Sequence, residues 1–419
     1  MRAFLVSTMG VTCTAALVLP LAAPAGAAPD APARDSGLPG STQSLPLDAL
    51  PPPSARATGA PAGERGLAER QVRPFSLAGV VWDDVDAELH GTAQVRVRAP
   101  GTHRWSGWPD LETHNADHAP DPGSAERAAG AVKGSTAPLW VGPSDGVEVR
   151  VRPEAPGTRC GAPLPLPAGL HLELVDPGED PQEVTGTAGA TGRESGVLPA
   201  LDRAETEAAA GLAPAARPYI GPRPRIVTRK GWGADEKLRE KGFAYTRTVK
   251  AAFVHHTATG NTYRCSQAPS VIRGIYRFHV RSNGWRDLGY NFLVDKCGNV
   301  YEGRAGGVTR AVLGAHTLGF NTDTMGVAVL GTYRDSRPPA AAVTAISRLT
   351  AWKLGLSGAD PKGKVRLVSA GGGTYKKGRR VEMNVISGHR DGFATDCPGA
   401  RLYKKLGTTR TTAARLQGR

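Results

Sequence analysis

The apolar residues of this chain follow two different periodicities in two separate stretches. From Phe75 to about Pro177, apolar and polar residues alternate in short runs such as Gly146–Val151, with Pro-Gly turns between the runs. This period of two predicts strands with one buried face. After residue 222, apolar segments of strand length alternate with segments of helical spacing, which predicts a mixed sheet covered by helices. A chain of 419 residues has room for both folded units.

The N-terminus has the pattern of a removed export signal. Arg2 precedes an apolar run from Ala3 to Leu21, and small residues at positions 25–27 follow the run. A membrane anchor is the alternative, but the run is barely long enough to cross a bilayer and ends among prolines. We therefore expect a secreted protein, associated with a cell wall, whose mature chain has no transmembrane segment.

Composition and periodicity together divide the chain into five segments. Ala, Pro, Gly and Ser dominate the second and fourth, which predicts connections without regular structure apart from some helix in the fourth. The third is expected to be a β-rich accessory domain resembling a β-sandwich, and the fifth an α/β domain with a central mixed sheet flanked by helices. The segments are a signal peptide (1–28), a disordered leader (29–73), the accessory domain (74–178), a linker (179–221) and the α/β domain (222–419).

Charge is divided unevenly between the two halves of the chain. Residues 221–419 contain 35 Lys and Arg against 12 Asp and Glu, whereas residues 1–220 contain 17 against 26. A basic half indicates a polyanionic partner, and export favours anionic cell-wall polymers over nucleic acid. The acidic first half also permits docking onto the basic half, which would shield a groove there.

Two histidine motifs near opposite ends of the last domain suggest a metal site. His255-His256 follows the apolar strand Ala251–Val254, and seven residues separate His389 from Cys397. Alone, the first motif could be an exposed turn, and the cysteine could be free or disulfide-bonded. Together they supply the three ligands of a catalytic zinc, which keeps a fourth position for water and makes that water acidic. Neighbouring strand residues point to opposite faces, so only one of the histidine pair can bind.

Several separated motifs occur in a characteristic order along the last domain. They begin with the Gly231-Trp232-Gly233-Ala234 motif and continue with His255–Gly260, Gly284–Phe292, Tyr301–Arg304, Gly314–Thr317, and His389–Asp391 with Cys397-Pro398. In this order the sequence resembles the peptidoglycan recognition protein family, which is also that of the type-2 N-acetylmuramoyl-L-alanine amidases. The resemblance spans residues 226–406 and suggests a secreted bacterial form with an added N-terminal β domain.

The resemblance implies a zinc enzyme that hydrolyses the amide between N-acetylmuramoyl residues and L-alanine in peptidoglycan. It implies Zn²⁺ ligands at His255, His389 and Cys397, and a Tyr290 hydroxyl that stabilises the developing oxyanion. Thr395 stands where a related phage branch has lysine, so a hydroxyl would act on the oxyanion there. Two alternatives stay open: a non-catalytic peptidoglycan-binding receptor, and a peptidase that cleaves the stem peptide.

Four further positions resemble the groove that holds the muramyl-peptide. They are Trp285, Arg304, His316 and Asn321. The tryptophan could instead be a core aromatic, and His316 a capped turn residue. The apolar spacing predicts a helix from Ser266 to Ser282. His279 lies on its apolar face, so we expect a hydrogen-bonded core histidine rather than a substrate contact.

The remaining cysteines of the last domain, Cys265 and Cys297, are expected to form a disulfide, because an exported protein meets an oxidising environment. Such a bridge would join the loop after the first ligand strand to the hairpin beyond Tyr290. Two free thiols are the alternative. Cys160 then has no partner in the accessory domain.

Overall fold

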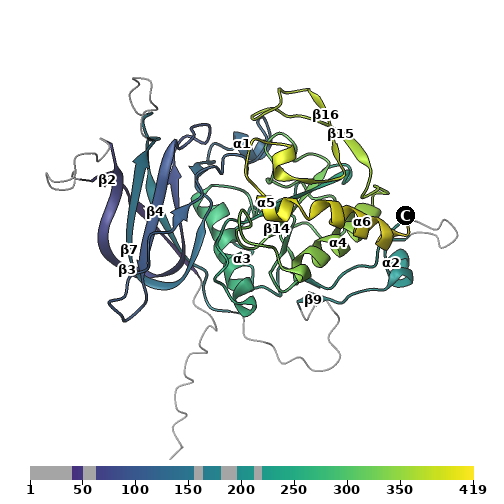
Figure 1. The fold of residues 1–419 in the computed structure, drawn as a ribbon, viewed down its shortest axis with the longest axis horizontal. Helices are drawn as coiled ribbons and strands as arrows, with labels where there is room; N and C mark the ends of the chain where they lie inside the picture. Colours follow the sequence, from purple (N-terminus) through teal and green to yellow (C-terminus); the bar gives the residue numbers. More distant parts are fainter. Residues whose placement is uncertain (1–39, 51–62, 155–163, 181–195, 212–218) are drawn as a thin grey trace, which may run out of the picture. The chain divides into compact units, whose positions relative to one another are not determined.

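The computed structural model describes residues 40–50, 63–154, 164–180, 196–211 and 219–419. The expected signal peptide and Cys160 lie outside these residues. Residues 37–419 cluster as one unit, in which an all-β part precedes an α/β part (Figure 1). In the part of the chain that is described, no helix is both long and apolar enough to cross a membrane.

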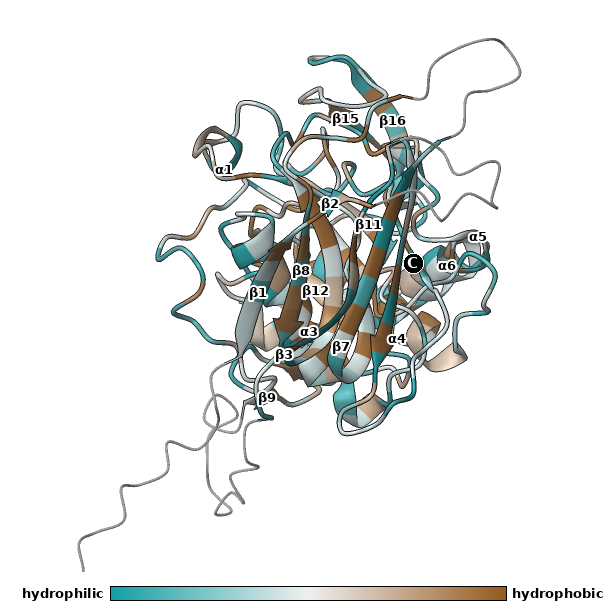
Figure 2. Cartoon of the chain, turned by 90° about the vertical axis from the view of Figure 1, so that its left-hand side faces the viewer, coloured by the Kyte–Doolittle hydropathy of each residue, from teal (hydrophilic) through white to brown (hydrophobic). Residues whose placement is uncertain are grey.

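The first part is an antiparallel sheet, which confirms the predicted β class. Its strands are β1 (Ser41–Pro46), β2 (Asp48–Ala49), β3 (Arg65–Trp82), β4 (Gly91–Arg98), β5 (Asp110–Leu111), β6 (Gly134–Ser135), β7 (Leu139–Pro153) and β8 (His171–Asp176). They are ordered β1-β8-β3-β7-β4-β5, and β2 and β6 pair with β3. Figure 2 shows the expected alternation as hydrophobic and hydrophilic bands along β7.

Regular structure begins inside the stretch 29–73, where composition predicts a leader. β1 pairs with β8 over its whole length, from Ser41 opposite Asp176 to Pro46 opposite His171. The strand has little apolar periodicity of its own, so pairing with a strand 130 residues away forms it. Local composition does not contain that information.

One long connection leaves this sheet between β5 and β6. We call residues 112–133 the β5–β6 segment. It contains the short helix α1 (Ala125–Ala128), whose N-cap Ser124 accepts a hydrogen bond from the Arg127 amide. The rest of the segment has no regular structure, and its position depends on contacts with the second part of the chain.

The second part is built on a mixed sheet, as predicted. Its strands are β9 (Val197–Leu198), β10 (Ile226–Val227), β11 (Ala251–His256), β12 (Phe292–Val294), β13 (Val300–Glu302), β14 (Thr324–Val329) and β17 (Ile386–Gly388), ordered β17-β11-β14-β12-β13-β10-β9. The central neighbours β17, β11, β14 and β12 are parallel. Every residue of β11 and β14 is buried, as expected for strands covered on both faces. A separate hairpin pairs β15 (Lys364–Val368) with β16 (Arg380–Asn384).

Helices cover both faces of this sheet. On one face, α4 (Ala340–Gly355) and α6 (Leu406–Gln417) bury Ile346 and Leu406 against the strands. On the other, α3 (Ala268–Arg277) packs against β12 and β14, and the same cluster contains Leu77 and Trp140 of the first sheet. Thus α3 lies between the two sheets (Figure 1). The short helices are α2 (Arg203–Ala209) and α5 (Ala400–Tyr403).

Candidate metal centre

The parallel pairing of β11 with β17 brings two histidines together. Val254 lies opposite Gly388 in the register, so His255 on β11 and His389, directly after β17, emerge at the same edge. The centroids of their imidazole rings are 4.5 Å apart. The chain then returns through a loop to Cys397, whose Sγ lies 3.8 Å from His255 Nδ1.

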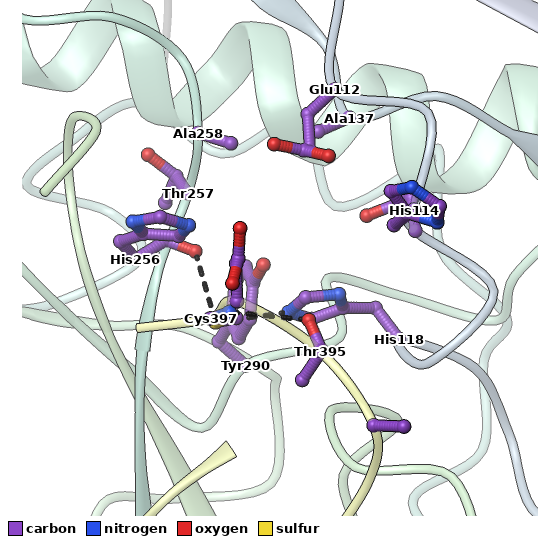
Figure 3. Close-up of a pocket in the computed structure, with 13 residues that line it drawn as sticks. Glu112, His114, His118, Ala137, His256, Thr257, Ala258, Tyr290, Thr395 and Cys397 are labelled. Atoms are coloured by element: carbon purple, nitrogen blue, oxygen red, sulfur yellow. Dashed lines mark hydrogen bonds between the residues drawn. The ribbon is translucent and has the colours of Figure 1, made fainter. Parts of the chain in front are cut away.

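A third histidine joins this group from the first part of the chain. His118, in the β5–β6 segment, places Nε2 3.8 Å from the sulfur of Cys397. Figure 3 shows the two side chains directed toward each other from the N-terminal and C-terminal segments. The candidate ligand atoms of His118, His255, His389 and Cys397 all lie within 4.8 Å of one another, and all four residues are buried.

These donors fit a zinc ion. In a tetrahedral site with Zn–S of about 2.3 Å and Zn–N of about 2.0 Å, sulfur and nitrogen are about 3.5 Å apart, close to the observed spacing. Both ring nitrogens of His389 are buried and have no hydrogen-bond partner in the described residues. Buried polar atoms rarely lack a partner, so these nitrogens suit a metal ligand.

The protonation states of His255, His389 and Cys397 are consistent with metal binding. Burial lowers the pKa of His389 to about 3 and the pKa of His255 well below its usual value, so both imidazoles are neutral, the form that binds metal. Burial also raises the pKa of the Cys397 thiol, which a metal would deprotonate.

One carboxylate orients the His118 imidazole and lies beside the His389 imidazole. Asp117 Oδ1 accepts a hydrogen bond from His118 Nδ1 at 2.9 Å, and Oδ2 lies 3.5 Å from His389 Nδ1. Burial by itself would raise the pKa of Asp117, but the adjacent imidazoles hold it below its usual range. This carboxylate–imidazole arrangement is the common outer support of zinc-binding histidines, and it directs Nε2 of His118 toward the metal position.

The other histidine of the strand-end pair has a different role. His256 Nδ1 accepts a hydrogen bond from the Tyr333 amide at 3.1 Å and does not belong to the ligand group. Of the expected pair, the structure therefore brings only His255 to the group, as alternation along a strand predicts. His279 accepts from the Gly289 amide at 3.1 Å and is buried, like a core histidine.

Tyr290 and Thr395 both face a cavity of about 360 Å³ beside Cys397. The Tyr290 ring lies 5.5 Å from the His255 ring, and burial raises the pKa of its phenol, so the hydroxyl keeps its proton. Thr395 Oγ1 accepts a hydrogen bond from the Cys397 amide at 3.1 Å. Both halves of the chain line the cavity, through Glu112, His114, Asn115, His118, Ala137, His256, Thr257, Ala258, Tyr290, Ala394, Thr395, Asp396 and Cys397 (Figure 3).

Two of the four expected groove residues are bound to the β5–β6 segment. The Arg304 guanidinium donates to both carboxylate oxygens of Glu126, at 2.8 and 2.9 Å. Asn321 Nδ2 donates to Asp121 Oδ1 at 2.7 Å and to the Ala119 carbonyl at 2.9 Å. Both side chains are therefore engaged within the chain.

The other two expected groove residues are buried away from the cavity. Trp285 packs with Val132 and Ala315, and its ring lies 4.4 Å from the ring of His279. His316 is fully buried, and its Nδ1 lies 3.1 Å from Thr317 Oγ1. In this state none of the four lines the cavity beside Cys397.

Cys265 and Cys297 form a disulfide, so the segment before α3 is joined to the turn between β12 and β13. Cys397 is a free cysteine, which leaves its sulfur available to the metal group.

Neither His118 nor Asp117 is assigned a role by the sequence motifs. Their only local signal is an adjacent Asp-His pair in a loop of the accessory domain, 137 residues before His255. Only the docking of that loop onto the second part of the chain brings them to the site.

Comparison with known proteins agrees with this architecture. Residues 245–400 match the family model described as N-acetylmuramoyl-L-alanine amidase. Peptidoglycan-recognition protein SC2 of Drosophila simulans is 31% identical over 185 residues, which are 44% of this chain and 85% of that protein. The chain belongs to the peptidoglycan recognition protein family. Peptidoglycan recognition protein 1 of Bos indicus is also 31% identical over 185 residues, 43% of this chain and 80% of that protein.

The family domain does not account for the whole site. The solved wild-type Drosophila PGRP-LB is 25% identical and covers 44% of this chain and 93% of its own, with a TM-score of 0.35. Residues 30–181 match a different model, described as Rv3811 N-terminal galactose-binding domain-like. Three members of the ligand group thus lie in the peptidoglycan recognition protein domain, whereas His118 belongs to the added domain.

Proposed function

We propose that this protein is a zinc-dependent amidase that hydrolyses the bond between N-acetylmuramoyl residues and L-alanine in bacterial peptidoglycan. The observation that supports this most directly is the convergence of His255, His389 and Cys397 inside an amidase-family domain. When bound, zinc supplies Lewis acidity and lowers the pKa of water toward neutrality.

The cavity residues have matching roles. Tyr290 keeps its proton at neutral pH because burial raises its pKa, so its hydroxyl donates to the oxyanion that develops on the scissile carbonyl. Thr395 supplies a second hydroxyl at the same cavity wall. Asp117 fixes the orientation of the His118 imidazole, and its second carboxylate oxygen lies 3.5 Å from His389 Nδ1.

A non-catalytic peptidoglycan receptor is the second candidate, since relatives are named for recognition. The enzyme is favoured because a receptor needs a groove but neither a buried thiol among imidazoles nor a buried phenol beside them. The export signal supports secretion, and the net positive charge of residues 221–419 supports contact with anionic wall polymers.

The test is product analysis of defined muropeptides incubated with the zinc-loaded protein. An amidase releases the muramyl lactyl group as a free carboxylate and a peptide with a free L-alanine amine. Cleavage between stem-peptide residues would identify a peptidase instead. Binding without turnover, by a protein that is fully zinc-loaded and has an open metal position, would identify a receptor.

A further inference from the structure

The β5–β6 segment makes its contacts through groups that are rarely buried. Asp117, Asp121 and Glu126 are each at most 7% exposed, although they belong to a connection between two strands. Buried carboxylates require partners. Nearly all of these partners come from the family domain, so the segment is fitted to that surface.

The contacts at the metal group are specific. His118 directs Nε2 toward the sulfur of Cys397, and Asp117 accepts from its opposite ring nitrogen. The Asp117 carbonyl also accepts a hydrogen bond from the Leu318 amide at 2.9 Å, which fixes the backbone beside the imidazole. His118 is therefore oriented like a ligand on both sides of its ring.

The contacts beyond the metal group involve the donors that the family resemblance assigns to substrate. Asp121 Oδ1 accepts from the Gly319 amide and from Asn321 Nδ2, each at 2.7 Å. Glu126 accepts from the Arg304 guanidinium and, at 3.0 Å, from the Arg286 amide. The carboxylates of the segment thus occupy Arg304 and Asn321, two of the four side chains that the resemblance assigns to the groove.

The number of protein ligands distinguishes two kinds of zinc site. A catalytic zinc has three protein ligands and an open position, whereas a zinc with four is closed. The family domain supplies three candidate ligands, and His118 places a fourth candidate ligand atom within 4.8 Å of the other three.

We propose that His118 is a fourth protein ligand of the metal and that the β5–β6 segment holds the protein in a closed state. Displacement of the segment would free the fourth position and, at the same time, release Arg304 and Asn321. The claim that His118 completes the metal coordination rests on geometry alone. The claim that this blocks turnover rests on the proposed amidase function.

The test uses the full chain with Co²⁺ in place of zinc, and azide as the probe. A closed site gives a four-coordinate cobalt spectrum that azide does not change. His118→Ala opens one position, so azide should then shift the visible bands. The matched control is His114→Ala, which removes an imidazole from the same segment and cavity but not from the ligand group. It should retain the unmodified spectrum and resist azide.

Metal release provides a second readout. Loss of a residue that only hydrogen-bonds a metal ligand already lowers metal affinity roughly 10–100-fold. Loss of a ligand itself should therefore lower the metal affinity of His118→Ala by at least about tenfold, as measured by chelator competition. Azide binding to the wild-type cobalt protein would overturn the proposal, even if the variant failed to fold. Unchanged metal affinity in a folded His118→Ala protein would overturn it as well.

Turnover separates this inference from the proposed function. His118→Ala, loaded at saturating zinc, should hydrolyse muropeptides at least about tenfold faster than the wild type. Slower turnover with metal retained would mean that His118 serves the open enzyme, and would contradict closure. If the cobalt results are as expected but neither protein turns over any muropeptide, the closed metal site stands and the amidase proposal fails.

Discussion

Glu126 and Arg304 lie 178 positions apart in the sequence and form a buried two-point ion pair, with N–O distances of 2.8 and 2.9 Å. Their side chains are only 7% and 5% exposed. Burial by itself would raise the pKa of Glu126, but the guanidinium holds it below its usual value. The pair therefore joins the accessory domain to the family domain as a charged, desolvated contact.

Removing the carboxylate should destabilise the folded chain strongly. Glu126→Gln removes the ion-pair partner of a buried guanidinium, and such losses typically lower the free energy of unfolding by roughly 3–5 kcal/mol. Denaturant unfolding measures the change. The control is Glu382→Gln, which breaks an exposed pair with Arg366 and should change stability little. Equal losses in both variants would contradict the role given to the buried pair.

The two adjacent histidines of β11 should differ in metal content. His255→Ala removes a ligand and should abolish stoichiometric zinc in the purified protein, as measured by elemental analysis. His256→Ala should retain zinc, because its Nδ1 accepts from the Tyr333 amide and the residue lies outside the ligand group. Zinc loss in the second variant but not in the first would reverse the assignment.

The phenol of Tyr290 should contribute to turnover and not to metal binding. Tyr290→Phe removes a donor to the oxyanion, so the rate of an open, zinc-loaded protein should fall about 100-fold or more at unchanged zinc content. Steady-state muropeptide hydrolysis in the His118→Ala background measures it. Tyr245→Phe, which removes an exposed hydroxyl bound to the Gly306 carbonyl, is the control. An unaltered rate in Tyr290→Phe would exclude the donor role.

The stability of the folded chain should depend on pH through Asp121. Burial raises the pKa of this carboxyl to about 6, against the opposing effect of hydrogen bonds from Gly319 and Asn321. The folded state therefore binds its proton more tightly than the unfolded chain does. This contribution is complete below about pH 4 and is lost as pH rises through about 6.

Comparison with Asp121→Asn isolates that contribution. Between pH 4 and pH 7, the wild type should lose roughly 3 kcal/mol more unfolding free energy than the variant, at 1.4 kcal/mol per pKa unit. Denaturant unfolding at each pH provides the measurement. Parallel pH profiles for the two proteins would show that Asp121 does not titrate in this range.

Helices and strands were predictable from the sequence wherever the element's own apolar residues repeat with a helical or strand period. The helix α3 and the buried strand β11 were predictable because their apolar spacing is sufficient to define them. β1 was not, because it lies in an Ala- and Pro-rich stretch and depends on pairing with β8. The β class of the first part and the mixed sheet of the second are confirmed by the observed pairing.

The site was predictable only within one domain. His255, His389 and Cys397 belong to motifs in one family pattern, and the parallel strands β11 and β17 bring the two histidines to the same edge. His118 belongs to no such motif, and its position follows from docking between two parts of the chain that match different family models. The charge asymmetry between the halves suggested docking in general but could not specify which imidazole or carboxylate would take part.

The ligands of the metal in the purified, full-length protein test the account most directly. X-ray absorption at the zinc edge, combined with elemental analysis, should give one zinc per chain with one sulfur at about 2.3 Å and three imidazole nitrogens at about 2.0–2.1 Å. A protein that takes up no stoichiometric zinc, or a zinc whose nearest neighbours include no sulfur, would contradict it.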